Sequence, residues 1–225
     1  MTSHLHREIE GLKKRILSLS AIVEESVQLA VKALEDRDAA LAARVIKNDD
    51  DVIDLAEVDV EEECLKLLAL YQPVATDLRF IIAVLKINSD LERIGDMAVN
   101  IAERADFLAD EAPTPVPAMI GQMASAAQKM LKDSLDALVN MDGHLAARIF
   151  VADDEVDELN RRMYFETQDR IRSHPEELER LMHILSVSRH LERIADHATN
   201  IAEDVIYMVS GEIIRHKATD YKAQF

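Results

Sequence analysis

The feature that most constrains this chain is that part of its sequence occurs twice. Residues 90–103, DLERIGDMAVNIAE, recur as HLERIADHATNIAE at 190–203. Two further blocks recur in the same order: LAAR at 41–44 as 145–148, and Ile53-Asp54 as Val156-Asp157. Ordered matches at nearly one offset indicate an internal duplication. Whatever the first half folds into, the second half is therefore expected to fold into as well.

Apolar residues in each half are spaced as they are along α-helices. They recur at steps of three and four, which places them on one face of a helix. Three such seams are Leu12, Ile16, Leu19, Val23, Ser26, Ala30 and Ala33; Ile87, Leu91, Ile94, Ala98, Ile101, Ala105 and Leu108; and Val187, Leu191, Ile194, Ala198, Ile201, Val205 and Met208. Gly and Pro number only five each in 225 residues, so few positions interrupt long helices.

Short breaks divide each half into three helices. Asp38 and Asp142 are expected to cap the second helix of their half. Thr76 is expected to cap the third helix, and Ser173 with Glu176 resembles a capping box for the sixth. The expected helices are 5–35, 38–70, 76–109, 117–140, 143–172 and 175–210.

These patterns predict an all-α protein of two tandem three-helix antiparallel bundles, related by internal duplication and containing six long helices. The first bundle is expected to span residues 1–110 and the second residues 118–225. A Pro-rich linker over 111–117 is expected to join them. Because the turns are short, neighbouring helices must run antiparallel.

The charge balance excludes several classes of partner. The chain carries 43 acidic and 26 basic residues, a formal net charge of −17. Such a surface repels nucleic acids and anionic membranes, and it suits cations or a basic protein partner. The one cysteine, Cys64, cannot form an internal disulfide, and its acidic neighbours disfavour a reactive thiolate. With no apolar run long enough to span a bilayer, we expect a cytoplasmic protein without direct membrane insertion.

Acidic and amide side chains are expected to line the outer side of neighbouring helices. At about 100° per residue, one cluster of the third helix lies away from its apolar seam. It contains Glu92, Asp96, Asn100 and Glu103, and its counterpart in the second half contains Glu192, Asp196, Asn200 and Glu203. The preceding helix of each half adds Asp50, Asp54 and Glu57, or Asp153 and Asp157, with Asn160 in the position of Glu57.

Two interpretations of this acidic surface remain open. Carboxylates four residues apart can hold one cation, and a facing pair on the next helix can complete an oxygen-rich metal site. His197 would add an imidazole in the second half, where the first half has Met97. Alternatively the surface is simply solvated and neutralised by Arg93 and Arg193. The same like-charge repulsion in both halves favours considering a metal, although the sequence does not fix whether the two helices' acids face each other.

The sequence contains no constellation typical of an enzyme. A Gly-rich phosphate loop, a Ser/His/Asp set and a Cys/His set are all absent. Gly95 lies within an expected helix and becomes Ala195 in the second half, which indicates close helix packing. We therefore predict a protein that is not an enzyme.

Three blocks resemble the signatures of the PhoU family: QPVATDLR at 72–79, LERIGD at 91–96 and LERIADH at 191–197. The resemblance extends over almost the whole chain. It implies tandem three-helix bundles that commonly form homodimers and negatively regulate phosphate uptake and the phosphate-starvation response. It also implies an adaptor between the ATPase subunit of a phosphate ABC transporter and a sensor histidine kinase.

The resemblance also bears on the metal question. Some members of the PhoU family bind metal clusters through repeated acidic motifs, which here match Asp50/Asp54, Glu92/Asp96, Asp153/Asp157 and Glu192/Asp196. The implied cofactors are divalent or trivalent ions such as iron, zinc, manganese, nickel, calcium or magnesium. The alternative function is a metal-binding or metal-buffering helical protein with no phosphate role, and a third class is a structural spacer without a partner.

Overall fold

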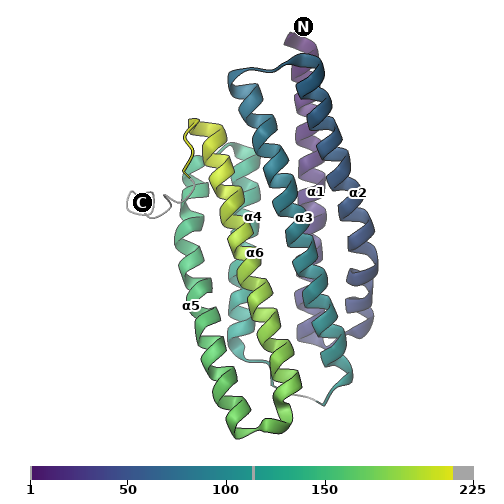
Figure 1. Cartoon of the computed structure of the whole chain (residues 1–225), viewed down its shortest axis with the longest axis vertical. Helices are drawn as coiled ribbons and strands as arrows, with labels where there is room; N and C mark the ends of the chain where they lie inside the picture. Colours follow the sequence, from purple (N-terminus) through teal and green to yellow (C-terminus); the bar gives the residue numbers. More distant parts are fainter. Residues whose placement is uncertain (1, 113–114, 215–225) are drawn as a thin grey trace.

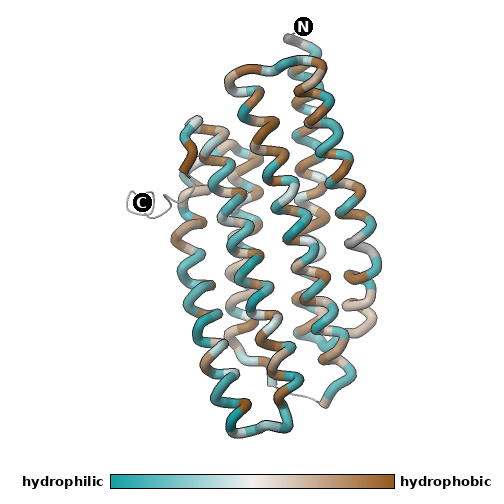
Figure 2. Tube along the Cα trace, in the orientation of Figure 1, coloured by the Kyte–Doolittle hydropathy of each residue, from teal (hydrophilic) through white to brown (hydrophobic). Residues whose placement is uncertain are grey.

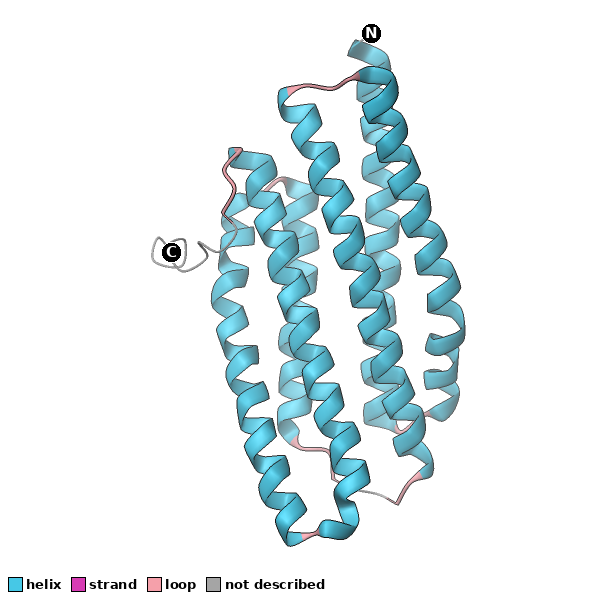
Figure 3. Cartoon of the chain, viewed as in Figure 1, coloured by secondary structure: helices cyan, strands magenta, loops and turns pink. Residues whose placement is uncertain are grey.

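The structure, a computed structural model, describes residues 2–112 and 115–214, except for the side chains of residues 2, 3 and 48–50. This part of the chain is helical and contains no strand (Figures 1 and 3). Its elements are α1 (Thr2–Asp36), α2 (Ala39–Tyr71), α3 (Ala75–Asp110), α4 (Ala118–Asn140), α5 (Gly143–Ser173), the 3-10 helix η1 (Pro175–Glu177) and α6 (Leu178–Ser210). The six predicted helices are confirmed. Linker residues 113–114 and the expected bundle residues 1 and 215–225 lie outside the described part.

Two of the predicted helix caps are confirmed. The Asp38 carboxylate accepts a hydrogen bond from the amide of Leu41 at 2.9 Å, at the start of α2. Asp142 accepts from the amides of His144 and Leu145 at 2.9 and 3.0 Å, at the start of α5. The amide of Leu145 is the main reason why the pKa of Asp142 is lowered. The duplicated halves thus begin their second helix in the same way.

The other two predicted caps are wrong. Thr76 lies inside the first turn of α3, which follows Val74 without a side-chain cap. The Ser173 hydroxyl donates to the carbonyls of Asp169 and Arg170, both at 3.1 Å, and so belongs to the end of α5. Pro175 then begins a 3-10 turn, which delays the start of α6 until Leu178.

The two three-helix bundles lie side by side, with α3 and α6 running along each other in the centre (Figure 1). α1 also packs against α4 across the junction. The described residues of α2 contact only α1 and α3, and those of α5 contact only α4, α6 and η1. α2 and α5 are therefore the outer helices of the molecule, and each has a face that no other described helix covers.

One hydrophobic core runs through both halves. All residues of the three predicted seams are buried, and apart from Ser26 they belong to one continuous cluster. Figure 2 shows hydrophobic and hydrophilic residues interleaved along the helices, as expected for amphipathic helices. Fully burying a Leu or Ile side chain contributes about 1.5–3 kcal/mol. The halves therefore stabilise each other, because α3 and α6 bury apolar residues against one another.

Across the described helices, no stretch combines the length and apolar character required to cross a lipid bilayer.

Candidate functional site

The acidic residues of α2 and α3 face one another in the first half. Glu92 is half-buried and Asp96 is exposed, so neither carboxylate points into the core. The pKa of Glu92 is raised by its burial and then by the negative charges of Asp96, Asp54 and Glu57. Since Asp54 and Glu57 belong to α2, carboxylates from both helices share one acidic face.

The second half repeats this arrangement. The pKa of Glu192 is raised by burial and then by Asp196, Asp157 and Asp153. The pKa of Asp196 is raised by burial and by Asp157, and His197 acts in the opposite direction. Asp153 and Asp157 lie on α5, so the α5 and α6 acids also face each other. Acids of the two helices thus interact in the same way in both halves.

Close packing beneath the first acidic face brings α2 and α3 together. A β-carbon at position 95 would lie 2.7 Å from Cδ1 of Ile53 and 3.3 Å from its Cγ2. Only glycine leaves room for the Ile53 side chain at this approach. The close packing predicted from Gly95 is confirmed, and it holds the neighbouring carboxylates of the two helices at short range.

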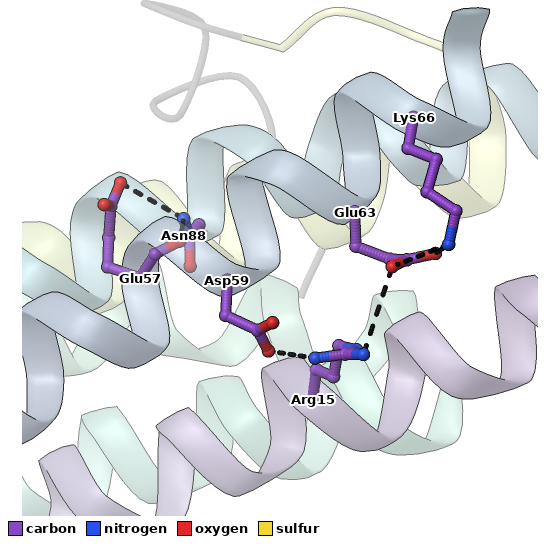
Figure 4. A network of polar contacts seen from close by, with 6 residues as sticks. All are labelled: Arg15, Glu57, Asp59, Glu63, Lys66 and Asn88. Carbon is purple, nitrogen blue, oxygen red and sulfur yellow. Dashed lines mark hydrogen bonds and ion pairs between the residues drawn. The ribbon is translucent and has the colours of Figure 1, made fainter.

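Glu57 and Asn160 distinguish the two acidic faces. Asn88 of α3 donates to the backbone carbonyl of Glu57 at 2.9 Å and to its Oε1 at 3.2 Å (Figure 4). The pKa of Glu57 is raised by burial and then by Glu61 and Asp54. In the second half, the Ser188 hydroxyl donates to Oδ1 of Asn160 at 3.0 Å. The polar contact is kept, but the second face has one carboxylate fewer.

Acids on the opposite side of α2 are paired with cations. Arg15 of α1 forms an ion pair with Asp59, and its Nη2 lies 4.0 Å from Oε2 of Glu63 (Figure 4). Lys66 lies 3.0 Å from Glu63 on the other side. The side of α2 that faces α1 is therefore neutralised, whereas the side that faces α3 meets further carboxylates.

The remaining predicted residues of α3 do not complete a common site. Asn100 donates to the carbonyl of Asp96 on its own helix at 2.7 Å. Glu103 pairs with the adjacent Arg104 at 3.0 Å. The side chain of Asp50, on α2, lies outside the described part. The facing group in the first half thus consists of Asp54, Glu57, Glu92 and Asp96.

On α6, Asn200 and His197 belong to the contact between the halves. Nδ1 of His197 lies 2.8 Å from Oδ1 of Asp90 on α3, and Asn200 donates to the same oxygen at 3.2 Å. His197 is only 7 % exposed. The imidazole therefore contacts α3 through Nδ1. Glu203 lies further along α6 and is half-buried.

Sequence reasoning did not identify the polar contacts between α3 and α6. Besides Asp90, these include Lys86, whose Nζ lies 2.8 Å from Oδ1 of buried Asp204. A signal was present in the duplication: positions 90 and 190 hold Asp and His, and positions 97 and 197 hold Met and His. These four positions differ between the halves, and all four lie at the contact between α3 and α6.

The acidic faces offer the oxygen donors that hard cations prefer. Among the side chains that the structure describes, no group of three or more His, Cys, Asp or Glu is close enough to surround one ion. The carboxylates of neighbouring helices are near enough to raise one another's pKa. The donor chemistry fits a metal, and the side-chain positions require adjustment.

Cys64 does not provide a reactive group. It is fully buried, and burial followed by the charges of Glu63 and Glu61 raises its pKa to about 12. The thiol stays protonated and unreactive, as predicted, but the side chain is fully buried in the core rather than half-buried.

The fold and its acidic faces define a class of duplicated helical-bundle protein with two equivalent carboxylate-rich surfaces. The family model described as PhoU domain matches the chain twice, at residues 16–105 and 120–205. The chain therefore belongs to the PhoU family.

Relatives and solved structures agree over nearly the full length. The chain is 42 % identical to the phosphate-specific transport system accessory protein PhoU homolog of Aquifex aeolicus, covering 98 % of this chain and 99 % of the relative. The crystal structure of PhoU from Pseudomonas aeruginosa matches with a TM-score of 0.89 and 39 % identity, covering 92 % and 99 %. The phosphate transport system regulatory protein PhoU from Streptococcus pneumoniae matches with a TM-score of 0.87 and 30 % identity, covering 93 % and 98 %.

Proposed function

We propose that this chain is a negative regulator of phosphate uptake and of the phosphate-starvation response. The observation that carries the proposal is the similarity over almost the entire chain to proteins named as accessory or regulatory proteins of phosphate transport. This similarity supports a role in the phosphate system. The more specific proposal is an adaptor, without enzymatic activity, between the ATPase subunit of a phosphate ABC transporter and a sensor histidine kinase.

The arrangement of the outer helices supports an adaptor. Within the described part of the chain, α2 and α5 contact only elements of their own halves, so two separate faces are available to two different partners. The net charge of −17 favours basic docking surfaces, and such contacts weaken as salt screens them. We place the protein in the cytoplasm, where both proposed partners expose their soluble parts, and we propose that it acts as a homodimer.

Deleting the gene and following a phosphate-responsive reporter in phosphate-rich medium tests the regulatory role. We expect the reporter to be switched on despite ample phosphate, and the wild-type gene to restore repression. A deletion strain that represses normally in high phosphate would refute the proposal. Binding of the purified protein to the transporter ATPase and to the kinase's cytoplasmic part, measured over a salt series, tests the adaptor role.

Metal binding is a second candidate, favoured by the carboxylates that face one another across α2 and α3 and across α5 and α6. Asp54, Glu57, Glu92 and Asp96 would hold an ion in the first half. The equivalent residues Asp157, Asn160, Glu192 and Asp196, which include one carboxylate fewer, would hold one in the second half together with Asp153. A bound cation would neutralise the clustered charge and clamp the two helices together.

Calorimetric titration of tag-free protein with manganese or iron tests this candidate. We expect Glu92→Ala with Asp96→Ala to abolish binding in the first half and to leave the weaker second half intact. Exposed Glu155→Ala with Glu158→Ala provides a control that removes the same charge from α5. Absence of binding by the wild-type protein for every metal tried would reduce the acidic faces to docking surfaces.

A further inference from the structure

α2 carries a second apolar seam that points away from its own bundle. Leu55, Val58 and Leu65 are 73, 49 and 54 % exposed. With exposed Glu62 and Ala69, they follow one another at steps of three and four. This is the spacing by which one helix packs against another. We call positions 55, 58, 62, 65 and 69 the α2 outer stripe.

The fold itself does not require the α2 outer stripe. Ile53 with Val156, and Glu57 with Asn160, fix the register of α2 on α5 at an offset of 103 residues. At that offset the stripe corresponds to Glu158, Arg161, Phe165, Gln168 and Arg172. The same helix in the same architecture is thus built with polar residues at all but one of these positions. The apolar residues of α2 therefore have another purpose.

The charge around the stripe selects the kind of partner. Residues 51–69, which span the stripe and the turn before it, contain seven acidic residues and one basic residue, Lys66, whereas the equivalent residues 154–172 contain six acidic residues and four arginines. Glu62 lies within the stripe, and Asp51 and Glu61 are exposed nearby. Two copies of α2 packed face to face would bring these acids together, which disfavours a second copy of this chain as the occupant.

A hollow beside the stripe provides a further apolar contact. It has a volume of about 230 Å³ and lies between α1 and α2. Ile22, Leu29, Val45 and half-exposed Val52 contribute its apolar lining, and Ser26 and the Arg44–Glu25 ion pair contribute its polar lining. Val52 lies one turn before Leu55, so the hollow adjoins the N-terminal end of the stripe.

We propose that the α2 outer stripe is the docking site for a basic amphipathic helix of a partner protein. The partner's apolar face packs on Leu55, Val58 and Leu65, and its lysines or arginines lie opposite Glu62 and Asp51. The stripe spans roughly 21 Å, which a partner helix of about 14 residues matches. The inference rests on the proposed adaptor function and identifies the chemistry of one of its two partners.

Fluorescence anisotropy with a labelled designed peptide tests the site directly. The probe is a Leu/Lys amphipathic helix of about 18 residues, compared with a peptide of the same composition in scrambled order. The test variant is Leu55→Glu, Val58→Arg and Leu65→Gln, which installs the α5 residues. Because this exchange leaves the net charge unchanged and uses residues that the repeat tolerates, a loss of binding reports the change at the stripe and not a change in overall charge. Phe165→Glu on α5 is the control.

We expect the amphipathic peptide to bind the wild-type protein and the control equally, and the triple variant about tenfold more weakly or worse. The scrambled peptide should bind the wild-type protein about tenfold more weakly. Equal binding by the triple variant, or equal binding of the scrambled peptide, would overturn the proposal. So would light scattering that shows a wild-type dimer and a monomeric triple variant, because a second copy would then occupy the stripe.

The reporter strain separates this inference from the proposed function. If the deletion derepresses the reporter and the triple variant fails to restore repression, the regulatory role and the docking site are both supported. If the triple variant restores repression fully, the docking site is refuted and the regulatory role remains. If the deletion has no effect, the regulatory role fails, and peptide binding alone then decides whether the stripe is a docking surface.

Discussion

In the first half of the molecule, Ile53 of α2 packs against Gly95 of α3; in the second half, the equivalent positions hold Val156 and Ala195, both fully buried. Compared with the first half, the second half has one side-chain carbon fewer at position 156 on α5 and one more at position 195 on α6. The volume at this contact is conserved although both residues differ. Duplicated bundles can therefore diverge in residue identity while keeping the helix separation that places their acidic faces.

The contact between the halves has diverged in charge. On one side, Asp90 pairs with His197 at 2.8 Å. On the other side, the equivalent residues are His190 and Met97, with Nδ1 3.3 Å from the sulfur. Burial, and then the charge of Arg104, lowers the pKa of His190 to about 4, so this side is neutral at pH 7. Only one side of the α3–α6 contact thus places a carboxylate at this position.

The largest effect is expected from breaking the Lys86–Asp204 pair. The carboxylate is 5 % exposed and the lysine 37 %, so Lys86→Ala leaves a buried charge without this partner. Removing one member of a buried pair costs about 3–5 kcal/mol, which we reduce to about 2 kcal/mol because the lysine is partly exposed. Urea unfolding measures the loss.

Lys132→Ala is the matched control, because its pair with Asp136 is exposed at 59 and 47 % and should contribute less than about 0.5 kcal/mol. Equal losses in the two variants would show that Lys86 and Asp204 do not specify how the halves pack.

Replacing His197 by Met, the residue at the equivalent position 97, should have the next largest effect on stability. His197→Met removes the hydrogen bond to Asp90, whose side chain is only 13 % exposed. A hydrogen bond to a charged group contributes about 1.5–3 kcal/mol, and Asn200 remains as a donor, so we expect a loss of about 1.5 kcal/mol in urea unfolding. His6→Met, at an exposed position of α1, should change stability little. An unchanged His197→Met protein would show that the pair is incidental.

Much of the fold could be predicted because its determinants are local. The three-and-four spacing of residues such as Leu91 and Ile94 identifies the buried side of a helix without knowledge of its neighbours. Asp38 and Asp142 cap helices within three residues of themselves. The prediction failed at Ser173 and Glu176, where Pro175 imposes a 3-10 turn before α6.

The site was less predictable because it depends on how helices rotate against one another. The sequence placed Glu92 and Asp96 on one face of α3, and the duplication located the same face on α6. It did not determine that Asp54 of α2 lies near enough to Glu92 to raise its pKa, which depends on how α2 packs on α3 over Gly95. The Asp90–His197 pair joins residues 107 positions apart and follows from the packing of one half on the other.

Gly95→Ala should reduce stability by a smaller amount, and adding Ile53→Val should offset part of that loss. Gly95→Ala places a β-carbon 2.7 Å from Ile53 Cδ1 and forces that side chain to move. Overpacking costs about 1–3 kcal/mol, and the better helix propensity of Ala returns up to about 1 kcal/mol, so we expect a net loss of about 1 kcal/mol. Ile53→Val alone should also destabilise, by creating a small cavity.

The double variant, which has the residues of the second half, should be more stable than the sum of the two losses predicts. Urea unfolding of all four proteins completes a double-mutant cycle. Strict additivity would mean that the two halves do not conserve volume at this contact.

The smallest effect concerns the repulsion within the acidic faces. Glu192→Gln removes a carboxylate whose pKa is raised by burial and by Asp196, Asp157 and Asp153, so in metal-free buffer it should stabilise the protein by about 0.3 kcal/mol. A carboxyl with a raised pKa in the folded protein destabilises only when ionised. The gain should therefore be absent at low pH, appear as the pH rises through the folded pKa, and shrink in high salt.

Asn160→Glu, which gives the second half the carboxylate that Glu57 provides in the first, should destabilise the metal-free protein by a similar amount. When a cation occupies the face, each carboxylate becomes a ligand. Glu192→Gln should then destabilise the protein and Asn160→Glu should stabilise it. Urea unfolding of both variants with chelator and with excess manganese thus distinguishes the two interpretations of the acidic faces. If each variant changes stability in the same direction in both buffers, metal binding is refuted, and the duplicated faces are solvated acidic surfaces with mutual repulsion.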